Sequence, residues 1–223
     1  HPRAVMLENV RGFLDPGFDE YREHIFSSIQ QLGYATHIKL LNASDYGVPQ
    51  LRPRVVIIGI RKDQCGAFAY PEEHSEDAPS VGETLYDLMA QSGWKGAKQW
   101  ASGANKIAPT LVGGSKKHGG PDLGPTRART AWAELGVDGR GIANEAPSPD
   151  FEGMPRLTSR MMARIQGFPD TWTFGNKKTI ACRMIGNAFP PPVARAVGIK
   201  IKECLDYGCV DCQSKVSVPQ KAV

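Results

Sequence analysis

The sequence lacks the features that define membrane and secreted proteins. Its longest clean apolar run, residues 55–60, is far shorter than the ~18 residues of a membrane span. No signal-peptide pattern opens the chain, and no methionine stands at position 1. The five cysteines form no even framework, which favours a reducing compartment over a disulfide-stapled fold. We therefore expect a soluble cytoplasmic protein. An apolar run three residues after His1 also favours a truncated or separated chain over a natural gene start.

The net charge of +4 is small, but the charges are unevenly distributed. Residues 63–94 contain seven acids and no lysine or arginine, whereas residues 95–130 contain seven lysines or arginines and one acid. A basic stretch of this kind suits a polyanion, because lysine and arginine near phosphates release condensed counterions. The alternative is an ordinary solvated face.

Strand and helix patterns alternate in the first part of the chain. The apolar run 4–7 predicts a strand, and apolar residues spaced by three and four over 18–33 predict an amphipathic helix. Residues 34–41 predict a second strand, and the connector 42–54 is rich in turn residues. Residues 55–60 are β-branched and apolar on both faces, so we expect them at the centre of the sheet. These elements indicate an α/β fold.

The rest of the chain divides by composition. Glycine and proline are frequent in the middle, which predicts a small loop-rich domain, and helical patterns return at 157–168 and 193–205. We expect a tail without regular structure after residue 212. The predicted divisions are 1–74 (part of the main domain), 75–175 (small domain), 176–212 (closing segment and helix of the main domain) and 213–223 (tail).

Chain direction brings polar side chains to one edge of the predicted sheet. If the strand at 4–7 runs up, a right-handed crossover brings 34–41 up beside it, and the connector then sends 55–60 down. Glu8 then shares an edge, the usual ligand edge of such sheets, with the residues that lead into the third strand. Those residues alternate along the chain and project to one side: Gln50, Arg52 and Arg54. Guanidiniums beside a carboxylate form either a structural salt-bridge cluster or a site that reads anions and bases.

Four segments resemble the later motifs of the DNA (cytosine-5) methyltransferases and occur in the order of that family. They are "ENV" at 8–10, "YGVPQLRPR" at 46–54, "RLTSRMMARIQGFPD" at 156–170 and "IGNAFPPPVARAVG" at 185–198. The segments "TLYDL" and "APTLVGG" between the second and third motifs also resemble the family. The resemblance implies part of a Rossmann-like, S-adenosylmethionine-dependent methyltransferase sheet with a small loop-rich target-recognition domain. It implies transfer of a methyl group to C5 of a flipped cytosine in duplex DNA.

The resemblance also implies roles for individual residues. Glu8 matches the glutamate that shares a proton with cytosine N3, which is general-acid help of about 10²–10⁴-fold. Arg52 and Arg54 match an arginine pair of which one holds the cytosine O2 and its phosphate and the other orders the pocket, and we favour Arg54 for the base. Asn187, followed by Ala188, matches the segment that closes the cofactor pocket. The alternative for Asn187 is a turn residue after a glycine.

The middle segment corresponds to the family's target-recognition domain. Thr110 and Leu111 resemble its Thr-Leu pair, and the run "GGSKKHGG" would bring two lysines and His118 to the duplex, with the lysines at the phosphates. The expected DNA-contacting residues are Gln50, Thr110, Leu111, Lys116, Lys117, Arg127, Arg129 and Arg160.

The chain departs from the family pattern in two respects. The family has glutamate three residues after Thr158, whereas this chain has Met161, so we expect one helix-capping hydrogen bond to be lost. The Gly-rich cofactor loop, the acidic ribose ligand and the Pro-Cys nucleophile of the family are also absent, since no cysteine follows a proline. We therefore expect this chain to need an N-terminal half or partner subunit for activity. Cys204, Cys209 and Cys212 favour a stray thiol cluster over a zinc site, and no metal site is predicted.

Three functions remain open at this point. The first is the C-terminal part of a cytosine-5 DNA methyltransferase, in the bacterial cytoplasm and associated with the nucleoid. The second is a non-catalytic DNA-binding module, against which Glu8 argues because binding alone has no use for an acid at N3. The third is a related RNA-directed methyltransferase. The long basic segment favours duplex DNA over RNA as the substrate.

Overall fold

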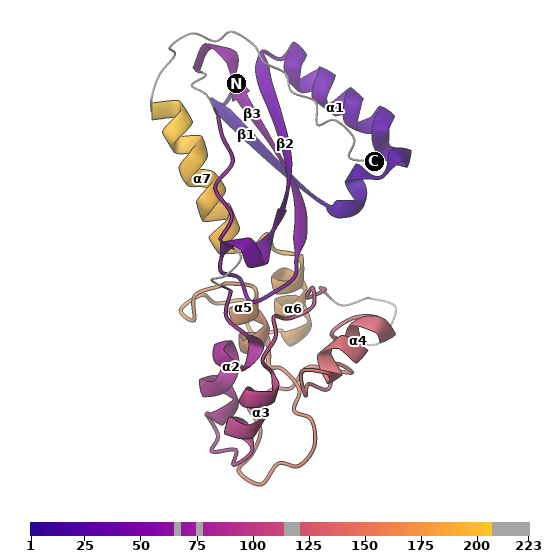
Figure 1. The fold of residues 1–223 in the computed structure, drawn as a ribbon, viewed down its shortest axis with the longest axis vertical. Coiled ribbons are helices and arrows are strands. Elements are labelled where there is room, and N and C mark those ends of the chain that lie inside the picture. The colour runs from indigo at the N-terminus through magenta and orange to yellow at the C-terminus, as the bar shows by residue number, and fades with distance from the viewer. Residues whose placement is uncertain (65–67, 75–77, 114–120, 207–223) are drawn as a thin grey trace. The chain divides into compact units, whose positions relative to one another are not determined.

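A computed structural model describes residues 1–64, 68–74, 78–113 and 121–206 (Figure 1). The chain forms two compact units. Unit 1 comprises residues 1–39, 55–71 and 197 onward, and unit 2 comprises residues 40–54 and 72–196. Each unit is built from stretches that are far apart in the sequence, whereas the predicted divisions are consecutive ranges of residues. The predicted domain boundaries stay a prediction, and the predicted tail lies outside the described residues.

A three-stranded sheet in the order β1-β3-β2 is the framework of unit 1. Its strands are β1 (Ala4–Val10), β2 (Tyr34–Asn42) and β3 (Pro53–Arg61). The Arg61 N–H donates to the Arg3 carbonyl and the Lys62 N–H to the Gly33 carbonyl, so the end of β3 lies beside the start of both neighbours. Strand β3 is therefore antiparallel to β1 and β2.

The central position predicted for residues 55–60 is confirmed, since all six are buried. The expectation that 34–41 runs directly beside 4–7 is wrong, because β3 lies between β1 and β2. The physical reason is the apolar character of β3, which is satisfied only when the strand has a neighbour along each edge and cover on each face.

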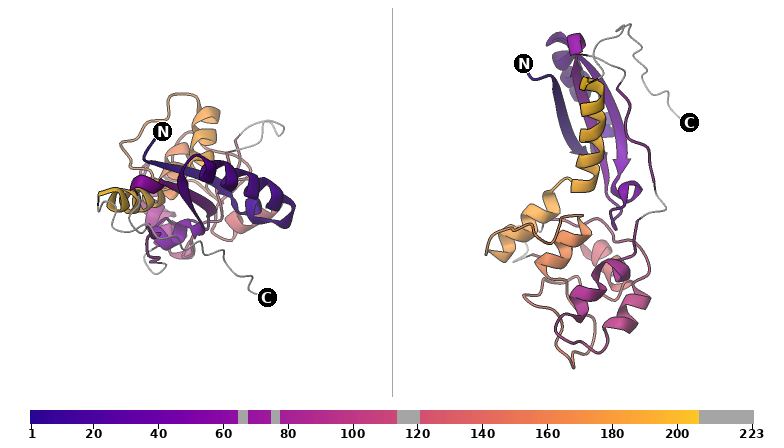
Figure 2. Two further views of the ribbon diagram at one scale, coloured as in Figure 1. Left: turned by 90° about the horizontal axis from the view of Figure 1, so that it is seen from above. Right: turned by 90° about the vertical axis from the view of Figure 1, so that its left-hand side faces the viewer.

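Two helices lie on opposite faces of this sheet, α1 (Asp19–Gln31) and the C-terminal part of α7 (Pro191–Asp206) (Figures 1 and 2). On the α1 side, Phe13, Val55 and Ile57 form a buried cluster, against which pack Ile25, Phe26 and Ile38. Helix α1 ends where Gly33 takes a left-handed conformation, φ +88°, as the sequence predicts. Short 3-10 turns at Arg11–Leu14, Pro16–Phe18, Ala43–Tyr46 and Lys62–Gln64 join the elements.

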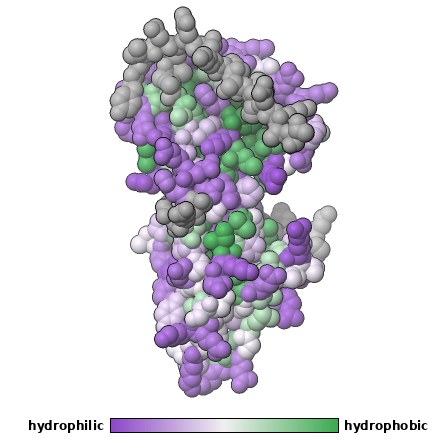
Figure 3. All heavy atoms as spheres, viewed as in Figure 1, coloured by the Kyte–Doolittle hydropathy of each residue, from purple (hydrophilic) through white to green (hydrophobic). Residues whose placement is uncertain are grey.

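Strand β1 is an edge strand of the sheet that the structure describes, yet its sequence is typical of an interior strand. Met6 (37% exposed), Leu7 (42%) and Val10 (55%) are exposed. Apolar side chains reach the surface of both units (Figure 3). An edge strand with apolar side chains on both faces offers unpaired backbone groups and apolar surface together.

Unit 2 is more helical than its Gly- and Pro-rich sequence predicts. It contains α2 (Val81–Ala90), α3 (Ala97–Gly103), α4 (Thr126–Ala133), α5 (Ser159–Ile165) and α6 (Lys178–Asn187). Their apolar faces meet in one continuous core that includes Leu85, Trp132 and Met162. The helices are short, so their periodicity is hidden among turn residues. No helix in the described ranges is long and apolar enough to cross a membrane.

Candidate functional site

Glu8 lies near the end of β1 and is exposed. The Arg61 N–H donates to the Arg3 carbonyl, so these two residues lie opposite each other in β3 and β1. A Cβ at Gly59 would meet Val5, which gives the same antiparallel register. Continued along the strand, this register places Glu8 opposite Val56. The carboxylate therefore stands at the sheet edge where β3 begins, as the topology predicts.

Arg52 is buried, with 1% of its surface exposed. Its guanidinium donates to the carbonyls of Leu111 (2.7 Å), Gly186 (2.7 Å) and Ala188 (3.0 Å). Gly186 belongs to the last turn of α6 and Ala188 is its C-cap, so two of these acceptors are at the negative end of a helix dipole. A buried cation is stabilised by such carbonyls. The Arg52 guanidinium is therefore engaged by backbone carbonyls within unit 2.

Two buried glutamines complete the surroundings of Arg52. Gln50 Oε1 accepts from the Leu111 N–H (2.7 Å) and the Arg52 guanidinium (3.4 Å), and Gln50 Nε2 donates to Gln166 Oε1 (2.7 Å). Gln166 Nε2 donates to the Ala188 carbonyl (2.5 Å). Both glutamines are fully buried. We call Gln50, Arg52 and Gln166 the buried polar cluster.

Gln166 is the residue of this cluster that the sequence analysis missed. It is the C-cap residue of α5 and follows the buried Met162 by four positions. Thr158 and Gln166, at the two ends of this helix, are its buried polar residues. A polar residue on an apolar helix face was the available signal, because such a residue is buried only with hydrogen-bond partners.

The residues before Arg52 run parallel to a segment of the middle region. The Leu51 N–H donates to the Ala108 carbonyl (2.8 Å) and the Ala108 N–H to the Pro49 carbonyl (2.9 Å). The Thr110 hydroxyl donates to the Leu51 carbonyl (2.5 Å). Leu111 is buried, so its side chain faces the core. The sequence-predicted Thr-Leu pair therefore lies against the arginine motif.

Two glycines allow the segment 110–113 to reach the end of α6. A Cβ at Gly186 would lie 2.4 Å from the backbone of Val112 and Gly113, and a Cβ at Gly113 would lie 2.5 Å from Asn187 Oδ1. Asn187 is exposed, while the Ala188 carbonyl is held by Arg52 and Gln166. An exposed amide on a fixed backbone can donate to a carboxylate and accept from an ammonium, and Asn187 offers such an amide.

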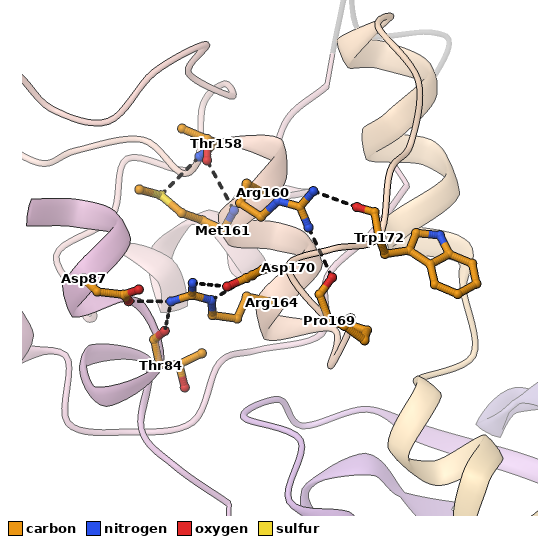
Figure 4. Close-up of polar contacts among 9 residues, drawn as sticks. All are labelled: Thr84, Asp87, Thr158, Arg160, Met161, Arg164, Pro169, Asp170 and Trp172. Atoms are coloured by element: carbon orange, nitrogen blue, oxygen red, sulfur yellow. Dashed lines mark hydrogen bonds and ion pairs between the residues drawn. The ribbon is translucent and has the colours of Figure 1, made fainter. Parts of the chain in front are cut away.

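The cap of α5 corrects an expectation (Figure 4). The Thr158 hydroxyl accepts from the Met161 N–H (3.2 Å), and the Thr158 N–H lies 3.4 Å from Met161 Sδ. The prediction that methionine loses the second capping bond is therefore wrong, because its sulfur takes the place of a carboxylate oxygen as a weak acceptor. A glutamate here would have to be buried, since Met161 is 1% exposed.

The arginines of α5 serve the neighbouring loop in the structure (Figure 4). Arg160 donates to the carbonyls of Pro169 (3.4 Å) and Trp172 (2.7 Å). Arg164 pairs with Asp87 and Asp170. Its hydrogen bond to Asp170 lowers the pKa of that carboxyl. Both guanidiniums therefore fix the chain after α5.

The other predicted contacts are spread over unit 2. Arg127 is exposed on α4, and Arg129 is half-buried with a hydrogen bond to Thr126 (3.3 Å). Lys116, Lys117 and His118 lie outside the described residues, as do Cys209 and Cys212. Within the part that is described, no group of His, Cys, Asp and Glu is placed to hold a metal. Arg54 donates to the Pro53 carbonyl (2.8 Å) and is half-buried.

Comparisons with known proteins agree with the motifs. The chain is 55% identical over 208 residues to the type II methyltransferase M.NaeI of Lentzea aerocolonigenes, covering 92% of this chain and 50% of that protein. It is 50% identical over 207 residues to M.NgoMIV of Neisseria gonorrhoeae, covering 92% and 65%. The chain thus spans about half to two thirds of these relatives. The crystal structure of S. pombe Dnmt2 methyltransferase shares the fold, with a TM-score of 0.53 at 14% identity, covering 90% of this chain and 64% of that one.

The fold is therefore that of the methyltransferases, with a mixed α/β architecture around a small sheet. The family model described as C-5 cytosine-specific DNA methylase matches residues 1–203. This match takes in β1, the arginine motif, the buried polar cluster and most of α7. The chain belongs to the C-5 cytosine-specific DNA methylase family.

Proposed function

We propose that this chain is the C-terminal portion of an enzyme that transfers a methyl group to C5 of a flipped cytosine in duplex DNA. The observation that carries the proposal is the family match over residues 1–203, which includes Glu8 at the end of β1. The relatives named as type II methyltransferases support a role beside a restriction system. A cytoplasmic location, where bacterial DNA lies, follows from this function, and association with the nucleoid stays a prediction.

Glu8 supplies the acid of the reaction in this proposal. Addition of a thiolate to cytosine C6 pushes electron density onto the ring, and a proton held at N3 stabilises that charge. The carboxyl at the end of β1 shares its proton with N3 once the base has left the duplex.

Arg54 and Arg52 divide the remaining work at the base. Arg54 is half-buried two positions before Val56, the residue opposite Glu8 in the sheet register, and we assign it to the cytosine O2. Arg52 is buried on three carbonyls, which supports the role of ordering the pocket rather than touching the base.

Asn187 and Ala188 close the cofactor pocket in this proposal. S-adenosylmethionine supplies an electrophilic methyl group when it is bound. The Asn187 amide contacts the polar part of the cofactor, and the backbone at Ala188 is kept in place by Arg52 and Gln166. The rest of the cofactor site is expected from the part of the relatives that this chain does not match.

Duplex DNA is the proposed partner of unit 2. Arg127 is exposed, which supports its proposed contact with a phosphate, and Arg129 and Thr110 are partly buried with hydrogen bonds inside the protein. Lys116 and Lys117 remain predicted phosphate contacts. The geometry supports indirect roles for three other predicted contacts, whose polar groups or side chains are engaged inside the protein: Gln50, Leu111 and Arg160.

A second polypeptide segment is needed to complete the enzyme in this proposal. No cysteine of this sequence follows a proline, so the nucleophile is expected from an N-terminal half or a partner subunit. The apolar edge strand β1 is where we expect that segment to add a strand, because Met6, Leu7 and Val10 are exposed there.

The test is methyl transfer from tritiated S-adenosylmethionine to duplex DNA. The full chain is supplied with the N-terminal half of a matching relative, and the wild type is compared with Glu8→Gln and Glu8→Asp. We expect transfer by the wild type and a loss of about 10²–10⁴-fold in Glu8→Gln. Undiminished activity in Glu8→Gln would remove the assigned acid. DNA binding without any methyl transfer would favour the alternative, a non-catalytic DNA-binding module.

A further inference from the structure

The buried polar cluster joins segments that have different proposed tasks. Arg52 holds Leu111, next to Thr110 in the predicted DNA-contacting pair, and it also holds Gly186 and Ala188 around the predicted cofactor contact Asn187. Leu111 is 59 residues from Arg52, and Gly186 is 134 residues from it. One side chain therefore holds together two segments that lie far apart in the sequence.

The glutamines form a second connection, which also depends on Arg52 because its guanidinium donates to Gln50 Oε1 (3.4 Å). Gln50 binds the Leu111 N–H and also Gln166, and Gln166 binds the Ala188 carbonyl. A continuous path of hydrogen bonds thus runs from the Leu111 backbone to the Ala188 backbone beside the path through Arg52. Both paths are buried, where an unmade hydrogen bond is costly because water cannot replace it.

The backbones of the two segments, 112–113 and 186, are in direct contact. Gly186 and Gly113 bring the backbones of 112–113 and 186 so near that neither position has room for a Cβ. Packed interiors of this kind transmit small displacements instead of absorbing them. A movement of 110–113 on DNA must then move the Asn187–Ala188 turn or break buried hydrogen bonds.

We infer that Arg52 is a positioning residue that couples DNA binding at the 110–113 segment to cofactor binding at the Asn187–Ala188 turn. This inference rests on the proposed function. Because coupling between two ligands is reciprocal, each ligand changes the affinity for the other by the same factor. Lysine at position 52 keeps the charge but cannot reach three carbonyls in a planar fork, so it weakens the coupling.

The experiment measures the dissociation constant of a fluorescent DNA duplex, by anisotropy, with and without S-adenosylhomocysteine. The full chain is used together with the N-terminal half of a matching relative. The wild type should show a ratio of about 5-fold or more, and Arg52→Lys should bring the ratio close to one. Arg164→Lys is the matched control, because Arg164 is another arginine of unit 2 that joins separate segments, but it is only partly buried and binds Asp87 and Asp170. It should keep the wild-type ratio.

Hydrogen exchange gives a second measurement that does not depend on ligands. Arg52→Lys should speed exchange of the Leu111 and Ala188 amides together, and Arg164→Lys should speed neither. If Arg52→Lys does not fold, Gln166→Met removes the bond to Ala188 at similar volume and should lower the ratio in the same direction.

The outcomes separate this inference from the proposed function. A wild-type protein that binds neither ligand refutes the proposed function, and the exchange rates then decide the cluster alone. A wild type that binds both ligands with a ratio of one, or an Arg52→Lys protein with an unchanged ratio, overturns the coupling. Exchange that rises at only one of the two amides overturns the shared role of Arg52.

Discussion

Gly186→Ala should destabilise unit 2 by forcing apart two backbones that are in direct contact. The added Cβ would lie 2.4 Å from Gly113 N and from the Val112 carbonyl group, whereas an ordinary contact begins at 3.4 Å. The segment 112–113 must therefore retreat by about 1 Å. Backbone atoms cannot rotate away as a flexible side chain can, so the strain spreads into the hydrogen bonds of Arg52.

The expected loss follows from three effects, two that destabilise the protein and one that stabilises it. Overpacking costs about 1–3 kcal/mol, and weakening one hydrogen bond from a charged donor costs about 1.5–3 kcal/mol. Alanine in a helix gains back about 0.5–1 kcal/mol over glycine. We expect a net destabilisation of about 1.5–5.5 kcal/mol, which is a large part of the ~5–15 kcal/mol stability of a typical domain.

Urea unfolding followed by tryptophan fluorescence measures this loss selectively. All four tryptophans, at positions 94, 100, 132 and 172, belong to unit 2. Gly103→Ala is the matched control, since it lies at the end of α3 in the same unit with nothing within 4 Å of the added Cβ. It should be neutral or stabilising by up to about 1 kcal/mol. A Gly186→Ala protein as stable as the control would refute the close packing of 112–113 on α6.

Two further predictions concern single contacts in unit 2. Met161→Leu keeps the volume but removes the sulfur that faces the Thr158 N–H, so urea midpoints should show a loss of about 1 kcal/mol; Ile165→Leu is the control, and equal losses would mean that the sulfur contributes nothing. The Arg140 and Arg156 guanidiniums hold the pKa of Asp138 well below its usual range. A carboxyl whose pKa is lowered by folding stabilises the folded state at pH values above its unfolded pKa of about 4. This stabilisation is lost as the pH falls from there through the folded-state pKa. Asp138→Asn should therefore reduce stability at pH 7 and flatten its fall in acid, and identical pH profiles for the two proteins would contradict the assignment.

The sequence predicts the regular parts of the fold because their patterns are local. The run of apolar residues around Ile58 predicts the buried strand. The spacing of apolar residues predicts the helix before Gly33, and Gly33 ends it. The position of β3 between β1 and β2 is not local, since either order satisfies the chain direction. Only the demand of a fully apolar strand for two neighbours decides it.

The site follows the same division. The resemblance of the motifs to the family predicts Glu8 and Arg54 at the base and Asn187 at the cofactor, and these roles stay predictions. The role of Arg52 as a clamp depends on which carbonyls surround it, and these come from residues 59 and more positions away. Sequence spacing carries no information on such contacts. The cap of Met161 was missed for another reason, because sulfur is a weak acceptor that propensity rules ignore.

The central claim is that this chain serves methyl transfer to carbon 5 of cytosine. Its most direct test is the identity of the methylated nucleoside, found by digesting the treated duplex DNA and analysing it by mass spectrometry with authentic standards. The full chain, supplied with the N-terminal half of a matching relative, should yield 5-methyl-2′-deoxycytidine, and the yield should fall in Glu8→Gln. A product methylated on a base nitrogen, or no methylated nucleoside from protein that binds both DNA and S-adenosylhomocysteine, would contradict the claim.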